Sequence, residues 1–281
     1  MITGTSRAKP LVFLRYTALV LIATVLLLPV YWLLMSSLRP ADQIFRHAGT
    51  FSLQTLVPMQ LTFENFRFIF SGTFPRALFN SMFIAVSTVI LGVFVNSLAG
   101  FAFAVFEFPF KRALFVVVLL SFMMPFESIV IPLYTLMRGL GWTDTYAALI
   151  LPEAAGGLVI FLFRQFFAGI PKEIYEAARL DGASWWQIYL RMTMPLSGPT
   201  VATASLMLFI HQWDAFFWPL VAASSENLAV VQVAIARNMT LEQANWGALF
   251  AAASSAVLVA MVPFLFLQRY YIRVVATQAD R

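Results

Sequence analysis

The sequence predicts an all-α membrane protein with six transmembrane helices and both termini in the cytoplasm. Three observations support this fold class. Hydrophobic residues make up 61% of the 281 residues, and a mean hydropathy of +0.83 indicates more apolar surface than one water-soluble core can bury. The apolar residues are gathered into six runs that are long enough to cross a bilayer as helices. The basic residues between the runs are distributed unequally, as in membrane proteins with a fixed orientation.

A helix needs about 20 apolar residues to cross the hydrocarbon core of a membrane. The runs of this kind are residues 16–35, 81–106, 113–137, 145–163, 200–223 and 247–267. The first run follows Arg7, Lys9 and Arg15 and so resembles the start of a signal peptide, but it is too long and has no small-residue cleavage site. We therefore expect a retained helix, in a single membrane domain that covers residues 1–281.

The distribution of basic residues predicts the orientation, because lysine and arginine favour cytoplasmic loops. With both termini inside, the cytoplasmic segments hold 12 of the 18 basic residues. These twelve are Arg7, Lys9, Arg15, Lys111, Arg112, Arg164, Lys172, Arg179, Arg191, Arg269, Arg273 and Arg281. The outer loop at residues 39–80 contains LTFENFRFIF, whose apolar residues have helical spacing. This topology places the polar segment 171–195 in the cytoplasm, between the fourth and fifth spans.

Residues 171–195, PKEIYEAARLDGASWWQIYLRMTMP, form a charged segment in a chain of which only 11% of the residues are charged. Glu173 and Glu176 lie near the positive end of a first helix, and Gly182 predicts its end. Ser184 and Gln187 have the spacing of a capping box that starts a second helix. The second helix has an apolar face, made by Trp185, Ile188, Tyr189 and Met192. Such a helix needs a partner or a membrane surface.

The same segment resembles a known motif. Glu176-Ala177-Ala178, Asp181-Gly182-Ala183 and Met192-Thr193-Met194-Pro195 match in spacing the EAA loop of permease subunits of ABC importers. Where the family usually has Ile and Leu, this chain has Met192 and Met194, which keep an apolar side chain of similar volume. The wider segment is similar to carbohydrate-uptake permeases, in particular the shorter, six-helix subunit of the maltose type. The resemblance implies a type I ABC importer fold in the bacterial plasma or inner membrane.

In that family the loop contains a coupling helix that docks onto a cytoplasmic ATPase subunit. The residues that the resemblance implies in this coupling are Glu176, Ala177, Ala178, Asp181, Gly182, Ala183, Trp185, Ile188 and Pro195. Glu176 would pair with a basic residue of the ATPase. The resemblance also implies a second permease subunit, two ATPase subunits that bind ATP and magnesium, and an extracytoplasmic solute-binding protein, with no cofactor on this chain. The residues alone leave open an amphipathic helix that lies on the membrane and stabilises only the permease.

Charged side chains within apolar runs are costly in lipid and therefore mark candidate functional sites. They are Glu127, Glu153, His211 and Asp214. Pro125, Pro132 and Pro152 each free a backbone carbonyl that the protein interior must satisfy. Sugar recognition combines aromatic faces with groups that bond hydroxyls, and we therefore take His211, Trp213, Asp214 and Glu127 as the candidate substrate pathway. The alternative is polar pairing and packing between helices, which we also expect for Asn96 and Ser97.

Several other functions are excluded or disfavoured. The absence of cysteine excludes disulfides and thiolate chemistry. The two histidines form no H-E-x-x-H motif, and we predict no metal site and no catalytic residues. No G-x-x-x-x-G-K-[ST] loop is present, so ATP hydrolysis belongs to a separate subunit. The scattered basic residues do not form a nucleic-acid-binding face.

Two questions stay open from the sequence. An ion-gradient-driven secondary transporter is the remaining alternative, which Glu127 and Glu153 partly fit, although no inverted repeat is evident. Monosaccharides, longer sugars, amino sugars and glycerol phosphodiesters all suit this kind of permease. In the resembled subunit, the loop corresponding to residues 224–245 reaches into the binding protein, and a solvated connector is an equally simple interpretation.

Overall fold

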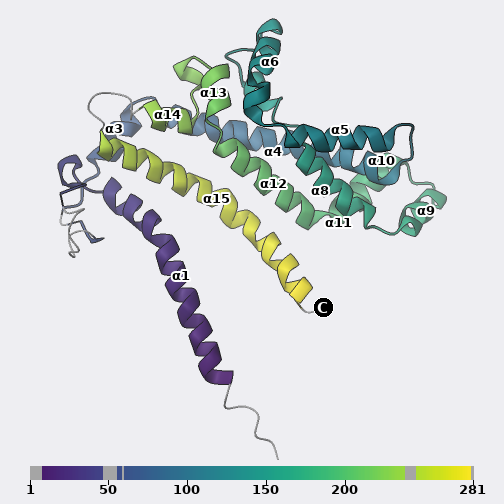
Figure 1. Cartoon of the computed structure of the whole chain (residues 1–281), viewed down its shortest axis with the longest axis horizontal. Coiled ribbons are helices and arrows are strands. Elements are labelled where there is room, and N and C mark those ends of the chain that lie inside the picture. Colours follow the sequence, from purple (N-terminus) through teal and green to yellow (C-terminus); the bar gives the residue numbers. More distant parts are fainter. Residues whose placement is uncertain (1–7, 47–55, 59, 238–244, 280–281) are drawn as a thin grey trace, which may run out of the picture. The chain divides into compact units, whose positions relative to one another are not determined.

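A computed structural model of the chain describes residues 8–46, 56–58, 60–237 and 245–279, and the side chains of these residues except at 8–11 and 267–279. The described residues form helices and connecting turns without any β-strand, which confirms the all-α prediction (Figure 1). By their internal contacts they divide into two compact units, Met1–Phe74 with Ile235–Val257 and Pro75–Ala234 with Leu258–Arg281. The single domain over residues 1–281 stays a prediction.

Three single helices in the described ranges are long and apolar enough to cross a membrane, namely Val12–Ser37, Phe74–Val105 and Trp246–Phe266. Two bent pairs raise the number to five if each is one span: Lys111–Met123 with Phe126–Gly139, bent by 102°, and Trp185–Leu196 with Gly198–Trp213, bent by 81°. The predicted span at 145–163 is divided into two short helices. The number of six spans and the cytoplasmic location of both ends stay predictions, and residues 1–7 and 280–281 lie outside the described ranges.

The first unit joins the end of α1 (Ala8–Ser37) to α3 (Glu64–Ser71) and to the start of α15 (Trp246–Ala279). A short 3-10 helix, Ala41–Gln43, follows α1. The buried Asn65 side chain donates to the carbonyls of Ser37 and Arg39, at 3.0 and 2.7 Å. Ser254 Oγ donates to the Leu33 carbonyl at 3.3 Å. Helix α3 confirms the helix that the apolar spacing of LTFENFRFIF predicts.

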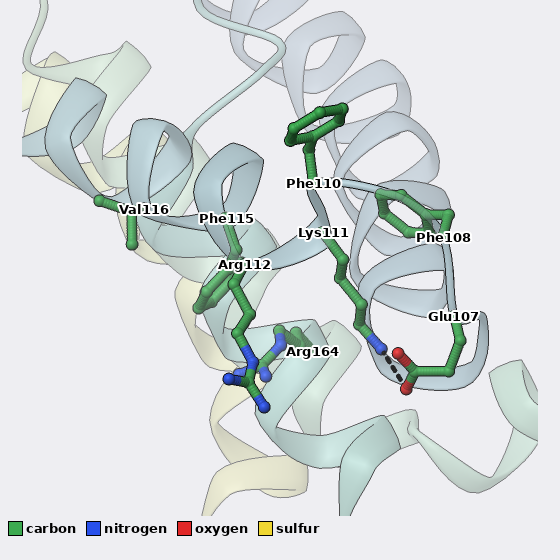
Figure 2. A pocket seen from close by; sticks show the side chains of 8 residues that line it. All are labelled: Glu107, Phe108, Phe110, Lys111, Arg112, Phe115, Val116 and Arg164. Carbon is green, nitrogen blue, oxygen red and sulfur yellow. Dashed lines mark hydrogen bonds and ion pairs between the residues drawn. The ribbon is translucent and has the colours of Figure 1, made fainter.

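The second unit contains most of the remaining helices. They are α4 (Phe74–Val105), α5 (Lys111–Met123), α6 (Phe126–Gly139), α7 (Tyr146–Ile150), α8 (Gly157–Ala168), α9 (Lys172–Leu180), α10 (Trp185–Ile188), α11 (Met194–Leu196), α12 (Gly198–Trp213), α13 (Phe217–Ala222) and the start of α14 (Val231–Arg237). A π-helical turn, Tyr189–Thr193, joins α10 to α11, and a 3-10 helix, Glu226–Leu228, precedes α14. Between α4 and α5, Lys111 Nζ donates to Glu107 Oε1 at 3.0 Å (Figure 2). It also donates to the Phe106 carbonyl at 2.7 Å.

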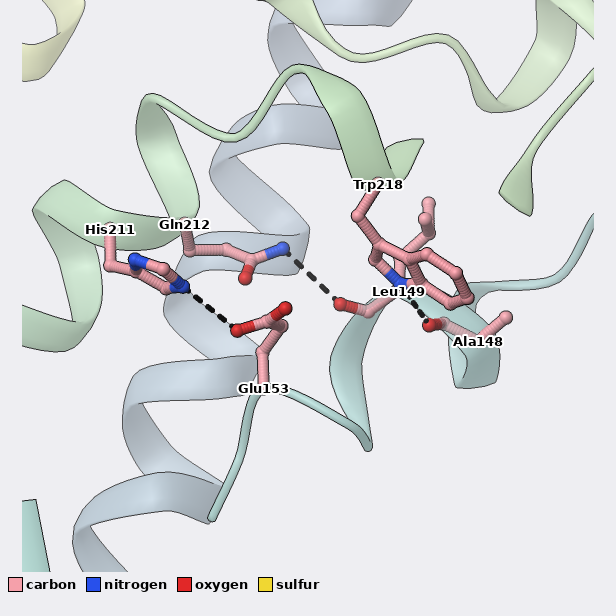
Figure 3. A network of polar contacts seen from close by, with 6 residues as sticks. All are labelled: Ala148, Leu149, Glu153, His211, Gln212 and Trp218. Carbon is pink, nitrogen blue, oxygen red and sulfur yellow. Dashed lines mark hydrogen bonds and ion pairs between the residues drawn. The ribbon is translucent and has the colours of Figure 1, made fainter. Parts of the chain in front are cut away.

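The break between α7 and α8 begins at Pro152, which has no amide hydrogen. The carbonyl of Ala148, four residues earlier, therefore lacks its helical donor. Trp218 Nε1 donates to this carbonyl at 2.9 Å instead, and Gln212 Nε2 donates to the Leu149 carbonyl at 3.2 Å (Figure 3). The carbonyl that Pro152 frees is thus satisfied inside the protein, as predicted.

Asn96 forms hydrogen bonds with backbone groups on the C-terminal side of the same break. This fully buried side chain donates to the carbonyls of Ala154 and Gly92, at 2.8 and 2.6 Å, and its Oδ1 accepts from the Gly156 amide at 2.9 Å. The neighbouring Ser97 hydroxyl lies 2.7 Å from Tyr189 Oη. Both residues pack helices together, which confirms the role expected for them.

The Asn96 contacts predict a clear effect of substitution. Asn96→Leu keeps the volume but removes three hydrogen bonds, each worth about 0.6 kcal/mol in a membrane protein, and we expect a loss of about 2 kcal/mol of unfolding free energy. Thr88→Val, two turns earlier on α4, is the matched control, because the buried Thr88 hydroxyl has no hydrogen-bond partner among the described residues. Denaturation in mixed detergent micelles, followed by circular dichroism, measures both. Equal stability of the two variants would contradict the assignment.

Candidate functional site

Segment 171–195 folds as the predicted helix, turn and second helix. Gly182 has a φ of +83°, in the left-handed region that glycine adopts without strain, and the Ala183 amide donates to the Ala178 carbonyl at 3.0 Å. Ser184 and Gln187 form the predicted capping box, with hydrogen bonds of 3.3 and 2.8 Å. The second helix differs from the prediction in one respect, since it continues as a π-helical turn after Ile188.

One face of the segment is anchored on the membrane helices. Tyr175, Ile188 and Tyr189 are buried, Ile188 with 1% of its surface exposed. Phe101 of α4 lies at their centre, with its ring centroid 6.2 Å from that of Tyr175 and 5.4 Å from that of Tyr189. Tyr175 Oη donates to the Phe167 carbonyl of α8 at 3.3 Å, and burial raises the pKa of Tyr175, which keeps the phenol neutral. The segment is therefore held by α4 and α8 together.

The remainder of α9 is largely exposed. Glu176, Ala177, Asp181 and Gly182 are all exposed, and Leu180 has 89% of its surface exposed. The Arg179 guanidinium interacts with residues of the same segment. It donates to the Ala183 carbonyl at 2.8 Å and lies over the Trp185 ring. Glu176 makes no hydrogen bond or ion pair in the part of the chain that the structure describes. These residues therefore present a carboxylate that forms no ion pair in the described ranges, beside an exposed leucine.

The residues that the motif singled out thus divide between the two faces. Ile188 packs inside the chain, and Ala178 and Ala183 lie against the same apolar cluster. Pro195 is exposed at the far end of the segment, and Trp185 is partly exposed. The motif did not single out Leu180 as a candidate contact residue. The only feature of the sequence that could have indicated its exposure is its position on α9 relative to Tyr175. Any contact of Ile188 with a partner would be indirect.

A cavity of about 730 Å³ lies beneath α9, between this helix and the ends of α4 and α8. Its charged lining comes from Glu107, Lys172, Glu176 and Arg179. The hydrogen bond from Lys111 and the charge of that lysine lower the pKa of Glu107, which lies outside the membrane-spanning segments. The Glu107 carboxylate in this lining is therefore ionised at neutral pH.

A second candidate site contains the charges from the apolar runs. His211 Nε2 lies 2.9 Å from Glu153 Oε2, which joins α12 to the break after α7 (Figure 3). Both residues line a cavity of about 620 Å³, together with Asp214 and the aromatic residues Phe126, Phe217 and Trp218. The cavity thus combines carboxylates, an imidazole and aromatic rings.

The structure brings only some of the predicted substrate-pathway residues to this cavity. His211 and Asp214 line it, as does Glu153. Trp213 is 6% exposed and stacks on Phe209, with ring centroids 5.6 Å apart. Glu127 is exposed in the first turn of α6 and does not line the cavity. No group of three metal-binding side chains occurs in the described ranges.

The loop at residues 224–245 is anchored at its start. Asn80 Nδ2 donates to the carbonyls of Asn227 and Ala229, at 2.9 and 3.0 Å, and Ser81 Oγ accepts from the Val231 amide at 2.7 Å. Residues 238–244 of this loop lie outside the described ranges. The insertion of the loop into a binding protein stays a prediction.

The comparisons with known proteins identify the family. Residues 89–276 match the model of the binding-protein-dependent transport system inner membrane component. The chain belongs to this family. It is a permease subunit of a binding-protein-dependent ABC importer, a multi-pass protein of the inner membrane and a non-catalytic component of its transport system. The alternative of an ion-gradient-driven secondary transporter finds no support.

Relatives of the permease match over nearly its whole length. The arabinooligosaccharides transport system permease protein AraQ of Halalkalibacterium halodurans is 33% identical, over 89% of this chain and 90% of its own. The lactose transport system permease protein LacG of Rhizobium radiobacter is 28% identical over 97% of each chain. The sn-glycerol-3-phosphate transport system permease protein UgpE of Rhizobium meliloti is 28% identical, over 89% of this chain and 90% of its own.

Solved structures support the fold of the permease. A chain of a bacterial ABC transporter involved in the import of the acidic polysaccharide alginate superposes with a TM-score of 0.81, covering 96% of this chain and all of that one at 19% identity. A chain of the alginate transporter in complex with an alginate pentasaccharide-bound periplasmic protein gives a TM-score of 0.62 at 20% identity, covering 93% of this chain and 95% of that one. The permease therefore has the fold of an ABC importer subunit.

The turn at Gly182 can be tested directly. Gly182→Val places a β-branched residue at positive φ, and we expect about tenfold less protection of the Ala183 amide from hydrogen exchange, because the cost is entirely in the backbone. An added Cβ meets no atom within 4 Å, so steric overlap does not contribute. Gly182→Asn, which tolerates this conformation, is the control and should keep most of the protection. Equal protection in both variants would show that the turn does not depend on glycine.

Proposed function

We propose that the permease is one half of a heterodimeric sugar importer. It pairs with a second permease subunit, and two ATPase subunits drive transport through the segment 171–195. Those subunits bind ATP and magnesium, and a solute-binding protein delivers the substrate from outside. The family description supports the dependence on a binding protein, and the alginate transporter crystallised with a periplasmic protein offers a parallel. Alternating access then moves the substrate to the cytoplasm.

The observation that carries the coupling proposal is the two-sided character of α9. Tyr175 is buried against α4 and α8, whereas Glu176 and Leu180 of the same helix are exposed and border an open cavity. A free carboxylate beside an exposed apolar side chain suits a protein partner that supplies a basic residue and an apolar contact. The motif spacing around Glu176 supports an ATPase as this partner.

The anchoring contacts give the coupling a mechanical route. The Phe101 ring touches Tyr175 and Tyr189, and the Ser97–Tyr189 hydrogen bond of 2.7 Å joins the segment to α4. Because the packed aromatic cluster is close to incompressible, a displacement of α9 by the ATPases moves α4 and α8 rather than bending the segment. This arrangement would convert closure of the ATPase dimer into a rearrangement of the membrane helices.

The substrate class follows from the relatives and from the second cavity. The relatives are named for arabinooligosaccharides, lactose and glycerol 3-phosphate. Glu153 and Asp214 place two carboxylates in the cavity against one imidazole, that of His211. Carboxylates accept hydrogen bonds from hydroxyls but repel phosphate and uronate groups. We therefore favour a neutral sugar, whose hydroxyls bond Glu153 while Phe126 or Phe217 covers an apolar ring face.

Charge reversal tests the coupling. In the complete importer reconstituted with its binding protein, Glu176→Lys should lower substrate-stimulated ATP hydrolysis at least about tenfold, because it replaces an attraction by a repulsion at a desolvated contact. Glu173→Lys, one turn away on the same exposed helix but outside the cavity lining, is the matched control and should keep most of the activity. Normal stimulated ATPase activity in Glu176→Lys, or an equal loss in the control, would overturn the proposal.

A panel of substrates tests the sugar class. Neutral mono- and oligosaccharides, alginate oligomers and glycerol 3-phosphate are offered to the reconstituted importer, and ATP hydrolysis and uptake are measured. We expect stimulation by a neutral sugar and a lower uptake rate for the Glu153→Gln variant. The reduction should be about fivefold to tenfold, the effect of weakening one charged hydrogen bond to a hydroxyl. Stimulation by anionic substrates alone would contradict the proposal.

A further inference from the structure

A separate cavity of about 640 Å³ lies between α5, α8 and the connection that leads from α4 to α5 (Figure 2). Three basic side chains line it. Lys111 and Arg112 come from the first turn of α5, and Arg164 comes from the second half of α8. The single carboxylate in the lining is that of Glu107. The cavity is therefore positively charged.

The charges in this lining are not equivalent. Lys111 Nζ already donates hydrogen bonds to Glu107 Oε1 and to the Phe106 carbonyl. Arg112 and Arg164 form no ion pair with a carboxylate in the part of the chain that the structure describes. The guanidinium of Arg164 lies over the Phe115 ring, 4.1 Å from its centroid, and its Nε is buried without a hydrogen-bond acceptor among the described residues.

These features indicate an anion as the natural occupant. A buried guanidinium N–H without an acceptor is costly, and two guanidinium groups in one cavity repel each other. The cation–π contact with Phe115 holds the Arg164 guanidinium at the cavity without using its N–H groups, and phosphate oxygens can accept two hydrogen bonds from its planar fork. A phosphate group within the cavity would satisfy both arginines.

The rim of the cavity indicates an amphipathic ligand rather than a free ion. Val116 lines the cavity and continues along α5 to Leu120 and Met123, at the i, i+4 and i+7 positions of one exposed helix face. Phe110, at the mouth, has 81% of its surface exposed. An acidic loop of a water-soluble partner would gain nothing from this apolar stripe, whereas an acyl chain would lie along it.

We propose that this cavity binds the phosphate of an anionic phospholipid, such as phosphatidylglycerol, with Arg112 and Arg164 on the headgroup and the Val116–Leu120–Met123 face against an acyl chain. Glu107 lines both this cavity and the one beneath α9, so the lipid adjoins the segment 171–195. The leaflet is the cytoplasmic one if the proposed coupling function holds. The binding itself does not depend on that function.

The test measures lipid preference in the full-length permease within its complex. Phosphatidylcholine nanodiscs receive spin-labelled phosphatidylglycerol or spin-labelled phosphatidylcholine, and electron paramagnetic resonance gives their relative association constants without ATP. We expect a preference for phosphatidylglycerol that falls about fivefold in Arg112→Gln and in Arg164→Gln, the effect of one basic residue near anionic lipid. Arg112 is exposed, so its replacement does not endanger folding.

Two controls make the outcome decisive. Arg191→Gln removes an exposed arginine of the segment 171–195 that does not line the cavity, and it should leave the lipid preference unchanged. Arg164→Lys keeps the charge but loses the planar fork, and we expect an intermediate preference. An equal preference in wild type and both Gln variants overturns the proposal, as does an equal loss in Arg191→Gln. Displacement of the lipid by millimolar inorganic phosphate overturns the lipid assignment. Because ATP is absent, these outcomes are independent of the Glu176 experiment.

Discussion

The second unit depends on the need to satisfy backbone groups that a broken helix frees inside a membrane, where water supplies no hydrogen bonds. Pro152 interrupts the segment after α7, and three side chains from other helices replace the lost partners. Trp218 and Gln212 donate hydrogen bonds to the carbonyls of Ala148 and Leu149 before the break. Asn96 donates to the Ala154 carbonyl and accepts from the Gly156 amide after it. The break can exist only where α4, α12 and α13 surround it, so its position also fixes theirs.

This constraint makes α4 the link between the two candidate sites. Asn96 holds the break that carries Glu153, and the adjacent Ser97 bonds Tyr189 of the segment 171–195. One helical turn further, Phe101 packs against Tyr175 and Tyr189. A shift of α4 along its axis would therefore act on the Glu153–His211 pair and on the anchored face of α9 at the same time. Such a connection is what a transporter driven from one face requires.

The segment 171–195 could be predicted in detail because its turn and caps depend on residues close together in the chain. Contacts between residues distant in the chain could not be predicted. The stop at Gly182 and the Ser184–Gln187 capping box depend on neighbours in the chain, and both are confirmed. The pairing of Glu153 with His211 joins residues 58 positions apart, and no periodicity encodes it. Pro125 was expected only to free a backbone carbonyl within one span at residues 113–137, whereas the structure divides that span into α5 and α6 with a bend of 102°, which depends on what surrounds it. The same limit applies to Ile188, whose apolar character did not say whether it packs inward or against a partner.

Two adjacent glycines extend the effect of the break to the contact between α5 and α8. The Gly156 amide is held by Asn96, and Gly157 opens α8 so close to α5 that a Cβ there would collide with the Val118 carbonyl. Because only glycine permits this approach, α5 and α8 lie side by side from their contact at Val118 to the cavity that Arg112 and Arg164 line. The helix pair that carries the two arginines therefore adjoins the break that positions Glu153. A ligand that bridges these arginines would stabilise the α5–α8 pair, and through Gly156 it would also stabilise the geometry of the second cavity.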